Sequence, residues 1–497
     1  MKIIRTIVAV AAIAVVAFIV VLNITFAVQE RLGLYFLVVL ACFVALILTF
    51  RHVDIPERPF LICFVLVALV AKIGLSLWID AAPVSDFARL YEAAKQVSAG
   101  DFSFQTMPYF QHWSYQTGFV LYEAFVIRLF GTGTTALIVL NGIQMTMTNL
   151  LVYGFIRKVS GNKACAMLGG ILYLFYPAPY FLGSVLTNQH LATLFLLLGL
   201  YCIVMVERNR LLYTLLAGVF IALGNIIHPI GIVPFVAVLL YLLLKFFEGI
   251  RDGFKKGLVR WGSRAVSFAA VYVCVGLLLS ALVVVSGINV YGIKNDDPLW
   301  KFAVGLNPQS GGTYSADIYE RVSNASDSEE RTKIESVIIS ENLSAIAKNP
   351  LHFIYDKNRR MWASYESTAW SFGADASANR TEGENTFWQR VAIPARKLDK
   401  CYYLIVLVLL LFGLGWAVKK RRVKLSTLLF VLVFLIYFGV HLLVEVQPRY
   451  RYFAMPIVFI VASCCAESLF HTKPLLRLSK RARMRLAGSS NSEMERS

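Results

Sequence analysis

The sequence predicts an all-α polytopic membrane protein with about twelve transmembrane helices and two larger outer-face loops that carry interfacial helices. Hydrophobic residues make up 58% of the 497 residues, whereas charged residues make up only 16%. The apolar residues gather into runs of about twenty, which is the length that crosses a hydrocarbon core. The predicted spans are residues 6–27, 34–50, 60–79, 135–156, 164–176, 189–206, 211–227, 230–247, 265–290, 401–418, 425–444 and 453–470.

The basic residues between these runs predict the orientation of the spans, because loops rich in Lys and Arg remain on the cytoplasmic side. If the chain starts inside with Lys2 and Arg5, every second loop is basic, whereas the short loops on the other side hold little positive charge before Arg449 and Arg451. We therefore expect a multi-pass plasma-membrane protein with both termini in the cytoplasm. The basic residues of the expected inner loops are Arg51, Arg58, Arg157, Lys158, Lys163, Arg208, Arg210, Lys255, Lys256, Arg260, Arg264, Lys419, Lys420, Arg421, Arg422 and Lys424.

The spans divide the chain into six parts. These are N-terminal transmembrane helices (1–79), a first outer loop with interfacial helices and catalytic residues (80–134), central transmembrane helices (135–290), a second large outer loop (291–400), C-terminal transmembrane helices (401–470) and a basic cytoplasmic tail (471–497). In the first loop, Phe87, Leu90, Tyr91 and Ala94 recur at helical spacing. In the second, residues 349–362 are amphipathic, basic and aromatic, a pattern typical of a headgroup surface.

Composition and missing motifs exclude several classes of protein. The net charge of +18 does not indicate a nucleic-acid partner, because most of the excess lies in the expected inner loops and tail, where topology and anionic lipids explain it. The eight cysteines are scattered and predict neither a disulfide framework nor a metal site. The sequence has no GxxxxGK[ST], no strand-GxGxxG-helix unit and no Asp-x-Asp. We therefore expect no nucleotide as direct donor.

A charged and aromatic segment, residues 444–452, separates the last two predicted spans. An ionised side chain at a helix centre costs about 2.5 to 3.5 kcal/mol on insertion scales, so such a segment is a candidate functional site. Its Glu445, Arg449 and Arg451 follow the eleventh span, as Asp86 follows the third, which places all four at the outer interface. Arginine suits a lipid phosphate, and a carboxylate can accept a proton from an attacking hydroxyl. The alternatives are a helix N-cap for Asp86 and interfacial snorkelling for the arginines.

Four stretches carry a resemblance to a known class of enzymes. They are Ser85-Asp86-Phe87 with Tyr91 and Ala94, residues 115–122 running to Leu129-Phe130-Gly131, residues 186–193, and Glu445-Val446-Gln447-Pro448-Arg449-Tyr450. In their order and expected outer location they resemble the membrane glycosyltransferases of the GT-C class, most closely the bacterial branch related to protein mannosyltransferases. The resemblance implies transfer of a hexosyl or pentosyl group from a polyprenyl-phosphate donor, with inversion, to an acceptor on the outer face. The donor lipid is then a substrate, and no other cofactor is expected.

The resemblance also implies roles for individual residues. An acidic residue of the first outer loop acts as base in that class, which carries over to Asp86. Many members have two adjacent acidic residues there, whereas this chain has Asp86-Phe87, so a second carboxylate is unassigned and the case for a metal is weakened. Arg449 would stabilise the charge on the departing lipid phosphate. Glu445 would orient Arg449 from one turn away if the helix continued, although a plain ion pair is an equal alternative.

Further candidates extend this site. Arg451, Lys357 and Arg360 are additional candidates for the donor phosphate, and the alternative for the last two is a headgroup-facing surface. Lys72 lies inside the third span, where it would either snorkel outward or contact the carrier phosphate. The pocket candidates, for which the alternative is a structural role, are Tyr450, Tyr91, His112, Gln116, His190 and His228.

Two other functions fit the same pattern. A transporter or flippase of lipid-linked sugars would also be polytopic, but such proteins place charges at the bilayer midplane on several helices. A polysaccharide polymerase or ligase would share the outer loops and the lipid-linked donor. The predicted partners are the lipid-linked sugar donor, membrane lipids, and an envelope glycan, teichoic acid or protein as acceptor.

Overall fold

The computed structural model describes residues 2–205, 211–250, 253–295, 297–325, 327–420 and 423–465. The predicted cytoplasmic tail, and the predicted inner-loop residues Arg208, Arg210, Arg421 and Arg422, lie outside these ranges. Within the ranges, the chain forms helices joined by turns and loops and contains no strand. The predicted all-α fold class is confirmed.

Each of the twelve predicted spans overlaps a helix in the described part of the chain, while residues 206 and 466–470 of the predicted spans lie outside it. These helices are α1 (Lys2–Gln29), α2 (Gly33–His52), α3 (Glu57–Ile79), α7 (Thr135–Ser160), α8 (Lys163–Leu174), α10 (Gln189–Met205), α11 (Leu211–Ile227), α12 (Ile232–Gly249), α14 (Ser263–Val285), α20 (Glu382–Lys419), α21 (Leu425–Leu443) and α22 (Arg451–Cys465). Among the described residues, nine helical stretches are long and apolar enough to cross a membrane, and α10 and α11 are shorter. The polytopic architecture is therefore present, whereas the number twelve stays a prediction.

The outside of the bundle is apolar, as a lipid-facing surface requires. Leu34, Val70 and Val266 have 74%, 74% and 70% of their surface exposed although they belong to α2, α3 and α14. In contrast, α22 is buried almost along its whole described length. It packs against α7, α8, α20 and α21, so this last span lies at the centre of the bundle.

The first outer segment folds into short helices: α4 (Ser85–Ser98), a 3-10 turn (Ser103–Thr106), α5 (Pro108–His112), a second 3-10 turn (Ser114–Gln116) and α6 (Thr117–Phe130). The predicted apolar face of α4 is confirmed, because Phe87, Leu90, Tyr91 and Ala94 are all buried. The N-cap position of α4 is Val84, and no side chain caps the helix. Asp86 therefore lies in the first turn and does not act as the cap.

The second outer segment is also helical. It contains α15 (Trp300–Gly305), α16 (Ala316–Ser323), α17 (Ser328–Lys348), α18 (Pro350–Asn358), a π-helical turn (Arg359–Ala363), α19 (Ala369–Phe372) and a 3-10 turn (Ala374–Ser377). Four further short elements lie between spans: α9 (Ala178–Phe181), α13 (Phe254–Gly257), the π-helical turn that follows it (Leu258–Gly262) and a 3-10 turn (Pro448–Tyr450).

The helix α20 begins far before the predicted span. Thr381 and Glu384 form a capping box in which each side chain bonds the backbone N–H of the other residue, at 2.9 and 3.4 Å. The helix then runs through residues 382–400, which the sequence analysis placed in the second outer loop. A hydropathy criterion misses residues 382–400 because they are polar. Since they continue into the membrane span as one helix, the helical geometry fixes the directions in which their side chains point.

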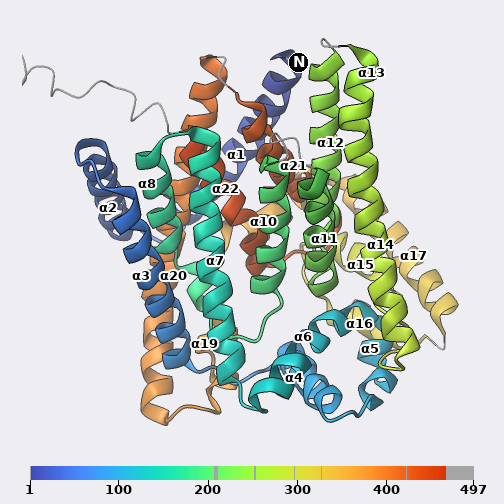
Figure 1. The fold of residues 1–497 in the computed structure, drawn as a ribbon. Coiled ribbons are helices and arrows are strands. Elements are labelled where there is room, and N and C mark those ends of the chain that lie inside the picture. Colours follow the sequence, from blue (N-terminus) through green and yellow to red (C-terminus); the bar gives the residue numbers. More distant parts are fainter. Residues whose placement is uncertain are drawn as a thin grey trace, which may run out of the picture.

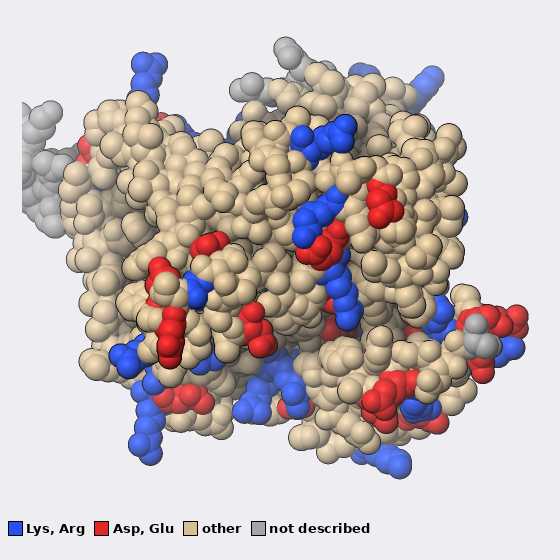
Figure 2. Space-filling model, turned by 90° about the horizontal axis from the view of Figure 1, so that it is seen from below, with Lys and Arg blue, Asp and Glu red and all other residues tan. Residues whose placement is uncertain are grey.

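Elements of both predicted outer segments gather at one end of the bundle. In Figure 1, α4, α5, α6 and α16 lie toward the lower end, whereas the N-terminus lies at the upper end. Viewed from below, this face carries basic and acidic side chains scattered among other residues (Figure 2). We call it the outer end, following the orientation that the basic loops predict.

The orientation can be tested by accessibility of introduced cysteines. Cysteine at Ser103 or Ser328, both exposed at the outer end, should react with an impermeant thiol reagent in intact cells. Cysteine at Ser263, exposed at the start of α14, should react only after the membrane is permeabilised. The measurement is mass-shift labelling in a parent that lacks the native cysteines. Labelling at Ser263 alone in intact cells would reverse the orientation.

Candidate active site

The charged segment between α21 and α22 is an extended strap, not a continued helix. The helix α21 ends at Leu443, and the chain then turns through the 3-10 turn Pro448–Tyr450 into α22. Two backbone hydrogen bonds fasten it to the second outer segment, from Glu445 N to Lys301 O at 2.9 Å and from Val446 N to Gly312 O at 2.8 Å. The predicted one-turn spacing between Glu445 and Arg449 is therefore wrong.

Glu445 nevertheless acts on Arg449, through an intermediate side chain. The ammonium group of Lys301 pairs with the Glu445 carboxylate, which also accepts a hydrogen bond from Gln447 Nε2 at 2.8 Å. The Gln447 carbonyl oxygen in turn accepts from Arg449 Nε at 2.8 Å. Burial alone would raise the pKa of Glu445, but the charge of Lys301 outweighs it and lowers this pKa. The carboxylate is thus charged and fixes the amide that holds Arg449.

Aromatic rings define the position of the Arg449 guanidinium. Its central carbon lies 5.3 Å from the centre of the Phe87 ring, 5.4 Å from Trp370 and 5.8 Å from Tyr450. Phe87 and Trp370 themselves meet edge to face at 5.6 Å. Cation–π contacts of this kind are favourable within about 6 Å. Arg449 therefore joins the start of α4 to the second outer segment.

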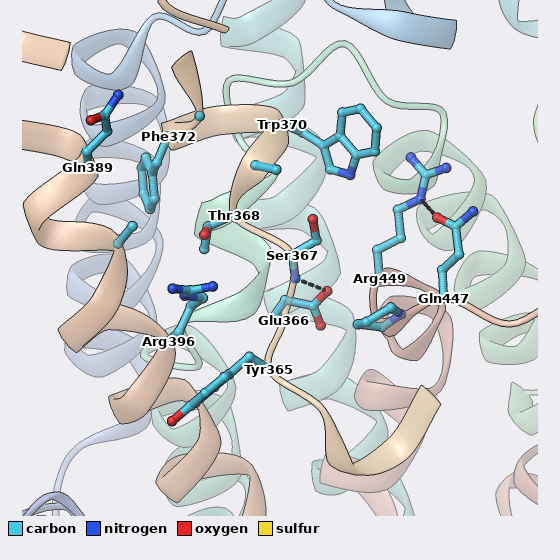
Figure 3. A pocket seen from close by; sticks show the side chains of 14 residues that line it. Tyr365, Glu366, Ser367, Thr368, Trp370, Phe372, Gln389, Arg396, Gln447 and Arg449 are labelled. Carbon is cyan, nitrogen blue, oxygen red and sulfur yellow. Dashed lines mark hydrogen bonds between the residues drawn. The ribbon is translucent and has the colours of Figure 1, made fainter. Parts of the chain in front are cut away.

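A cavity of about 500 Å³ opens beside Arg449. Figure 3 shows its wall, with Trp370 and Arg449 on one side and Gln389 and Arg396 of α20 on the other. The full lining is Tyr365, Glu366, Ser367, Thr368, Ala369, Trp370, Phe372, Gly373, Gln389, Ala392, Arg396, Gln447, Pro448 and Arg449. Aromatic faces, hydroxyls and guanidinium groups together suit a ligand with both sugar-like and anionic parts.

Asp86 lies next to Phe87 and is open to solvent. Half of its side-chain surface is exposed, and its nearest ionic partner is Arg89 at 3.8 Å. The preceding residue, Ser85, has a φ of 54°, a left-handed conformation that a non-glycine residue adopts only under constraint. Burial first, and then the charge of Asp86, raise the pKa of Tyr109. The Asp86 carboxylate is thus close enough to Tyr109 for its charge to affect the phenol.

Arg451 has a different role from the predicted phosphate ligand. Only 1% of its side chain is exposed, and its guanidinium pairs with the buried Glu366 carboxylate at 3.0 Å. It also donates to Ser364 O at 3.0 Å and to Pro448 O at 3.2 Å, and lies over the Tyr403 ring. All three of its nitrogens are therefore used within the protein. The chain uses Arg451 to join the strap to the second outer segment.

The other two phosphate candidates lie in α18 and the π-helical turn that follows it. Lys357 is buried, not headgroup-facing, and its ammonium group donates to Gly305 O. Burial lowers the pKa of Lys357 to about 7, against the opposing charge of Glu445. Arg360 is half-exposed and pairs with Asp356 at 3.0 Å, one turn away. Neither residue lines the cavity.

Two pocket candidates are packing residues. His190 is buried and both ring nitrogens are used, Nδ1 with the Tyr452 hydroxyl at 2.5 Å and Nε2 with Leu182 O at 2.9 Å. A carbonyl can only accept, so Nε2 carries the proton and Nδ1 accepts from tyrosine. The Tyr91 hydroxyl donates to Thr132 O and holds the loop after α6.

The remaining pocket candidates fall in two places. Tyr450 lies beside Arg449, and His228 stacks on Phe453 at 5.0 Å. Burial, assisted by the charges of Lys301 and Arg449, lowers the pKa of His228 to about 3, so this imidazole is neutral near the site. Gln116 donates to the Tyr109 hydroxyl at 3.2 Å.

His112 lies away from this cluster, among charges of the second outer segment. Burial lowers its pKa, followed by the charge of Arg331, while Asp297 opposes them.

Lys72 faces the protein interior. It is fully buried on α3 and its Nζ lies 4.4 Å from the centre of the Tyr180 ring. Snorkelling toward the lipid interface is therefore excluded by its orientation.

Four residues of the site were missed in the sequence: Lys301, Gln447, Trp370 and Arg396. Gln447 stands inside the charged segment, but nothing in its spacing shows that it links two charges.

Among the described residues, no group of three His, Cys, Asp or Glu side chains could hold a metal ion.

Comparisons with known proteins support the class of enzyme that the motifs indicate. Residues 119–286 match the family model described as dolichyl-phosphate-mannose-protein mannosyltransferase. This match covers about a third of the chain and agrees with the resemblance to membrane glycosyltransferases that the sequence motifs carry. It spans α6 to the end of α14 and includes neither Asp86 nor Arg449, so it assigns no role to either.

The chain matches no curated protein. Among solved structures it is similar to ArnT from Cupriavidus metallidurans, in a crystal structure with bound undecaprenyl phosphate. The sequence identity is 14% and the TM-score 0.38, and the alignment covers 83% of this chain and 78% of ArnT. A likeness of this degree transfers no residue role.

The buried ion pair yields a prediction about stability. Arg451→Ala leaves the Glu366 carboxylate buried without its partner, so unfolding free energy should fall by about 3 to 5 kcal/mol. Arg360→Ala breaks a half-exposed pair and should cost only about 0 to 1 kcal/mol. Thermal or denaturant unfolding in detergent measures both. Equal, small losses would show that the strap is held without the pair.

A second prediction concerns pH. Burial and a hydrogen bond with Asp297 raise the pKa of Glu335 to about 9 from an ordinary value of 4.5. The folded chain thus keeps a proton that the unfolded chain loses, so the contribution to stability is full below pH 4.5 and declines toward pH 9. Glu335→Gln keeps a donor and should flatten this decline in melting temperature. The control is Glu341→Gln on the same helix, whose carboxylate is exposed. Parallel curves for Glu335→Gln and wild type would contradict the shift.

Proposed function

We propose that the chain is a plasma-membrane glycosyltransferase that moves one sugar from a polyprenyl-phosphate carrier to an envelope acceptor on the outer face. The observation that carries this proposal is the Arg449 guanidinium, fixed by Gln447 and three rings at the wall of a cavity. Asp86 directly precedes one of these ring residues, Phe87, in the chain. The family match to mannosyltransferases that use a lipid-phosphate sugar supports the donor class. The acceptor is a glycan, a teichoic acid or a protein.

Arg449 is assigned to the carrier phosphate. Its guanidinium is permanently charged and presents paired N–H groups that match phosphate oxygens. Because Nε is already bonded to Gln447, the group is oriented before the substrate arrives. Such a preorganised cation stabilises charge that develops on a leaving phosphate without reorganising during the reaction.

Asp86 is assigned as the base. The acceptor hydroxyl attacks the anomeric carbon, its proton passes to the Asp86 carboxylate, and the bond from that carbon to the phosphate oxygen breaks. The electron pair leaves with the polyprenyl phosphate, where Arg449 balances it. A single displacement inverts the configuration at the anomeric carbon. The half-exposed position of Asp86 allows an acceptor to approach from solvent.

Other charged groups position Arg449 and the strap that carries it. Lys301 keeps Glu445 ionised, and Glu445 holds Gln447 against Arg449. The Arg451–Glu366 ion pair fastens the strap to the second outer segment. Tyr450 and the neutral His228 lie in the surroundings of Arg449. Lys357 instead binds the backbone carbonyl of Gly305.

A reconstituted transfer assay tests the function. Purified protein in lipid vesicles receives a labelled polyprenyl-phosphate sugar and envelope extract. Addition of one sugar supports the proposal. A ladder of products would indicate a polymerase, and movement of the donor between leaflets without transfer would indicate a flippase.

Asp86→Asn should lower turnover by roughly 10²- to 10⁴-fold, because the amide cannot take the proton of the acceptor. Donor binding and folding should persist, since Asp86 caps no helix. Glu92→Gln is the matched control, because Glu92 lies on the same helix in an exposed pair with Lys95. Near-normal turnover in Asp86→Asn would remove Asp86 from the mechanism.

Arg449→Lys should lower turnover more than donor affinity, because lysine keeps the charge but cannot hold the planar geometry. Loss of one charge-assisted hydrogen bond of about 1.5 to 3 kcal/mol corresponds to roughly 10- to 100-fold in rate. Arg449→Ala should lose affinity as well.

Arg128→Lys, at an exposed site on α6, is the control for transfer by reconstituted membranes. If the two lysine variants behave alike, Arg449 has no special role toward the phosphate.

A further inference from the structure

The cavity has an excess of positive charge. Arg396 and Arg449 both line it, and Glu366 is its carboxylate. Glu366 is already neutralised, because one oxygen pairs with Arg451 at 3.0 Å and the other accepts from Ser367 N at 3.1 Å. A cavity lined by two arginines, whose one carboxylate is already paired, favours an anionic ligand.

Arg396 has no anionic partner in the described part of the chain. Its guanidinium lies 5.5 Å from the centre of the Tyr365 ring, and its Nε is buried without a hydrogen bond. Buried donors in native proteins nearly always have a partner, and an exception suggests an ion or ligand. The neighbouring basic residues differ: Lys400 donates to Ala363 O at 2.5 Å, and Lys397 lies over Tyr35.

Local structure directs Arg396 into the cavity. Because α20 is continuous from Glu382, Gln389, Ala392 and Arg396 recur at spacings of three and four residues and share one face. All three line the cavity. Figure 3 shows Arg396 across the lining from Arg449, with Ser367 and Thr368 between them.

We propose that Arg396 binds a phosphate group of the ligand that occupies this cavity, from the wall opposite Arg449. The hydroxyls of Ser367 and Thr368 then lie where polar parts of the same ligand pass between the two arginines. This inference rests on the proposed function for the phosphate on a lipid carrier. A phosphate group of a polymeric acceptor, such as a glycerol phosphate unit, offers the same chemistry.

Binding, not transfer, tests the proposal. Full-length protein in nanodiscs is titrated with a synthetic polyprenyl phosphate, and separately with glycerol phosphate, for wild type, Arg396→Gln, Arg396→Lys and Arg390→Gln. Arg390 is exposed on the same helix and is the matched control. We expect Arg396→Gln to weaken binding at least tenfold, Arg396→Lys to weaken it less, and Arg390→Gln to leave it unchanged.

The arms of this experiment separate the sources of phosphate. Dependence on Arg396 for the lipid alone assigns the carrier, and dependence for glycerol phosphate alone assigns the acceptor. Equal affinity of wild type and Arg396→Gln for both probes, or no binding of either probe by wild type, would overturn the inference. If Arg396→Gln unfolds, the folded Arg396→Lys variant is used instead, and its titrations are repeated with inorganic phosphate as a competitor of each probe. The inference would also be overturned if this variant binds both probes as wild type does and inorganic phosphate competes with them to the same extent.

The two proposals fail in different ways. A wild-type protein that binds polyprenyl phosphate through Arg396 but transfers no sugar would contradict the proposed function only. An Arg396→Gln variant that transfers sugar normally and binds both polyprenyl phosphate and glycerol phosphate as tightly as wild type would contradict this inference only.

Discussion

The architecture of the site depends on how the backbone of residues 362–366, which is largely irregular, is hydrogen-bonded within the helix bundle. Residues 362–366 are not regular helix beyond Ala363, and their carbonyl groups cannot be left without partners away from water. Three buried side chains satisfy them: Asn23 bonds Trp362 O at 3.0 Å, Lys400 bonds Ala363 O at 2.5 Å and Arg451 bonds Ser364 O at 3.0 Å. These side chains come from α1, α20 and α22, so the segment is fixed by the spans themselves.

The ion pair of Arg451 and Glu366 makes this arrangement specific. Both charges are almost fully buried, and a buried charge is tolerated only with a partner and further hydrogen bonds. Arg451 has both, because it also binds Ser364 O and Pro448 O. The same residue thereby fixes the second outer segment and the strap, and the cavity lies where the two meet. Arg449 lies two residues before Arg451 on the same strap, so the Arg451–Glu366 ion pair also fixes the position of Arg449.

Much of the fold could be predicted from composition, because the length of an apolar run has a direct physical meaning in a bilayer. The helices α1, α3 and α21 follow the predicted spans closely, and the buried face of α4 follows its periodicity. The start of α20 could not be found this way, since polar residues 382–400 carry no hydropathy signal. Arg396 was missed for that reason: it became a cavity residue only once the helix was seen to continue.

The site was predictable in part. Charge beside lipid identified Glu445 and Arg449, but the same argument selected Arg451, whose role differs. Sequence gives the presence of a charge and not its partner, and Glu366 lies 85 residues away. The helical assumption for residues 444–449 failed because the backbone N–H groups of the strap donate to the carbonyls of Lys301 and Gly312. Backbone partners so far away in the sequence leave no periodic pattern.

The two halves of the site differ in rigidity, which suits their proposed tasks. Arg449 is held by Gln447, three rings and the anchored strap, so the half that would receive charge from the leaving phosphate is fixed in advance. Asp86 is half-exposed, with an ionic partner only at 3.8 Å. Electrostatic stabilisation gains from preorganisation, whereas a base must admit acceptors from outside. In the proposed function, the fixed half would hold the carrier phosphate and the exposed half would admit the acceptor hydroxyl.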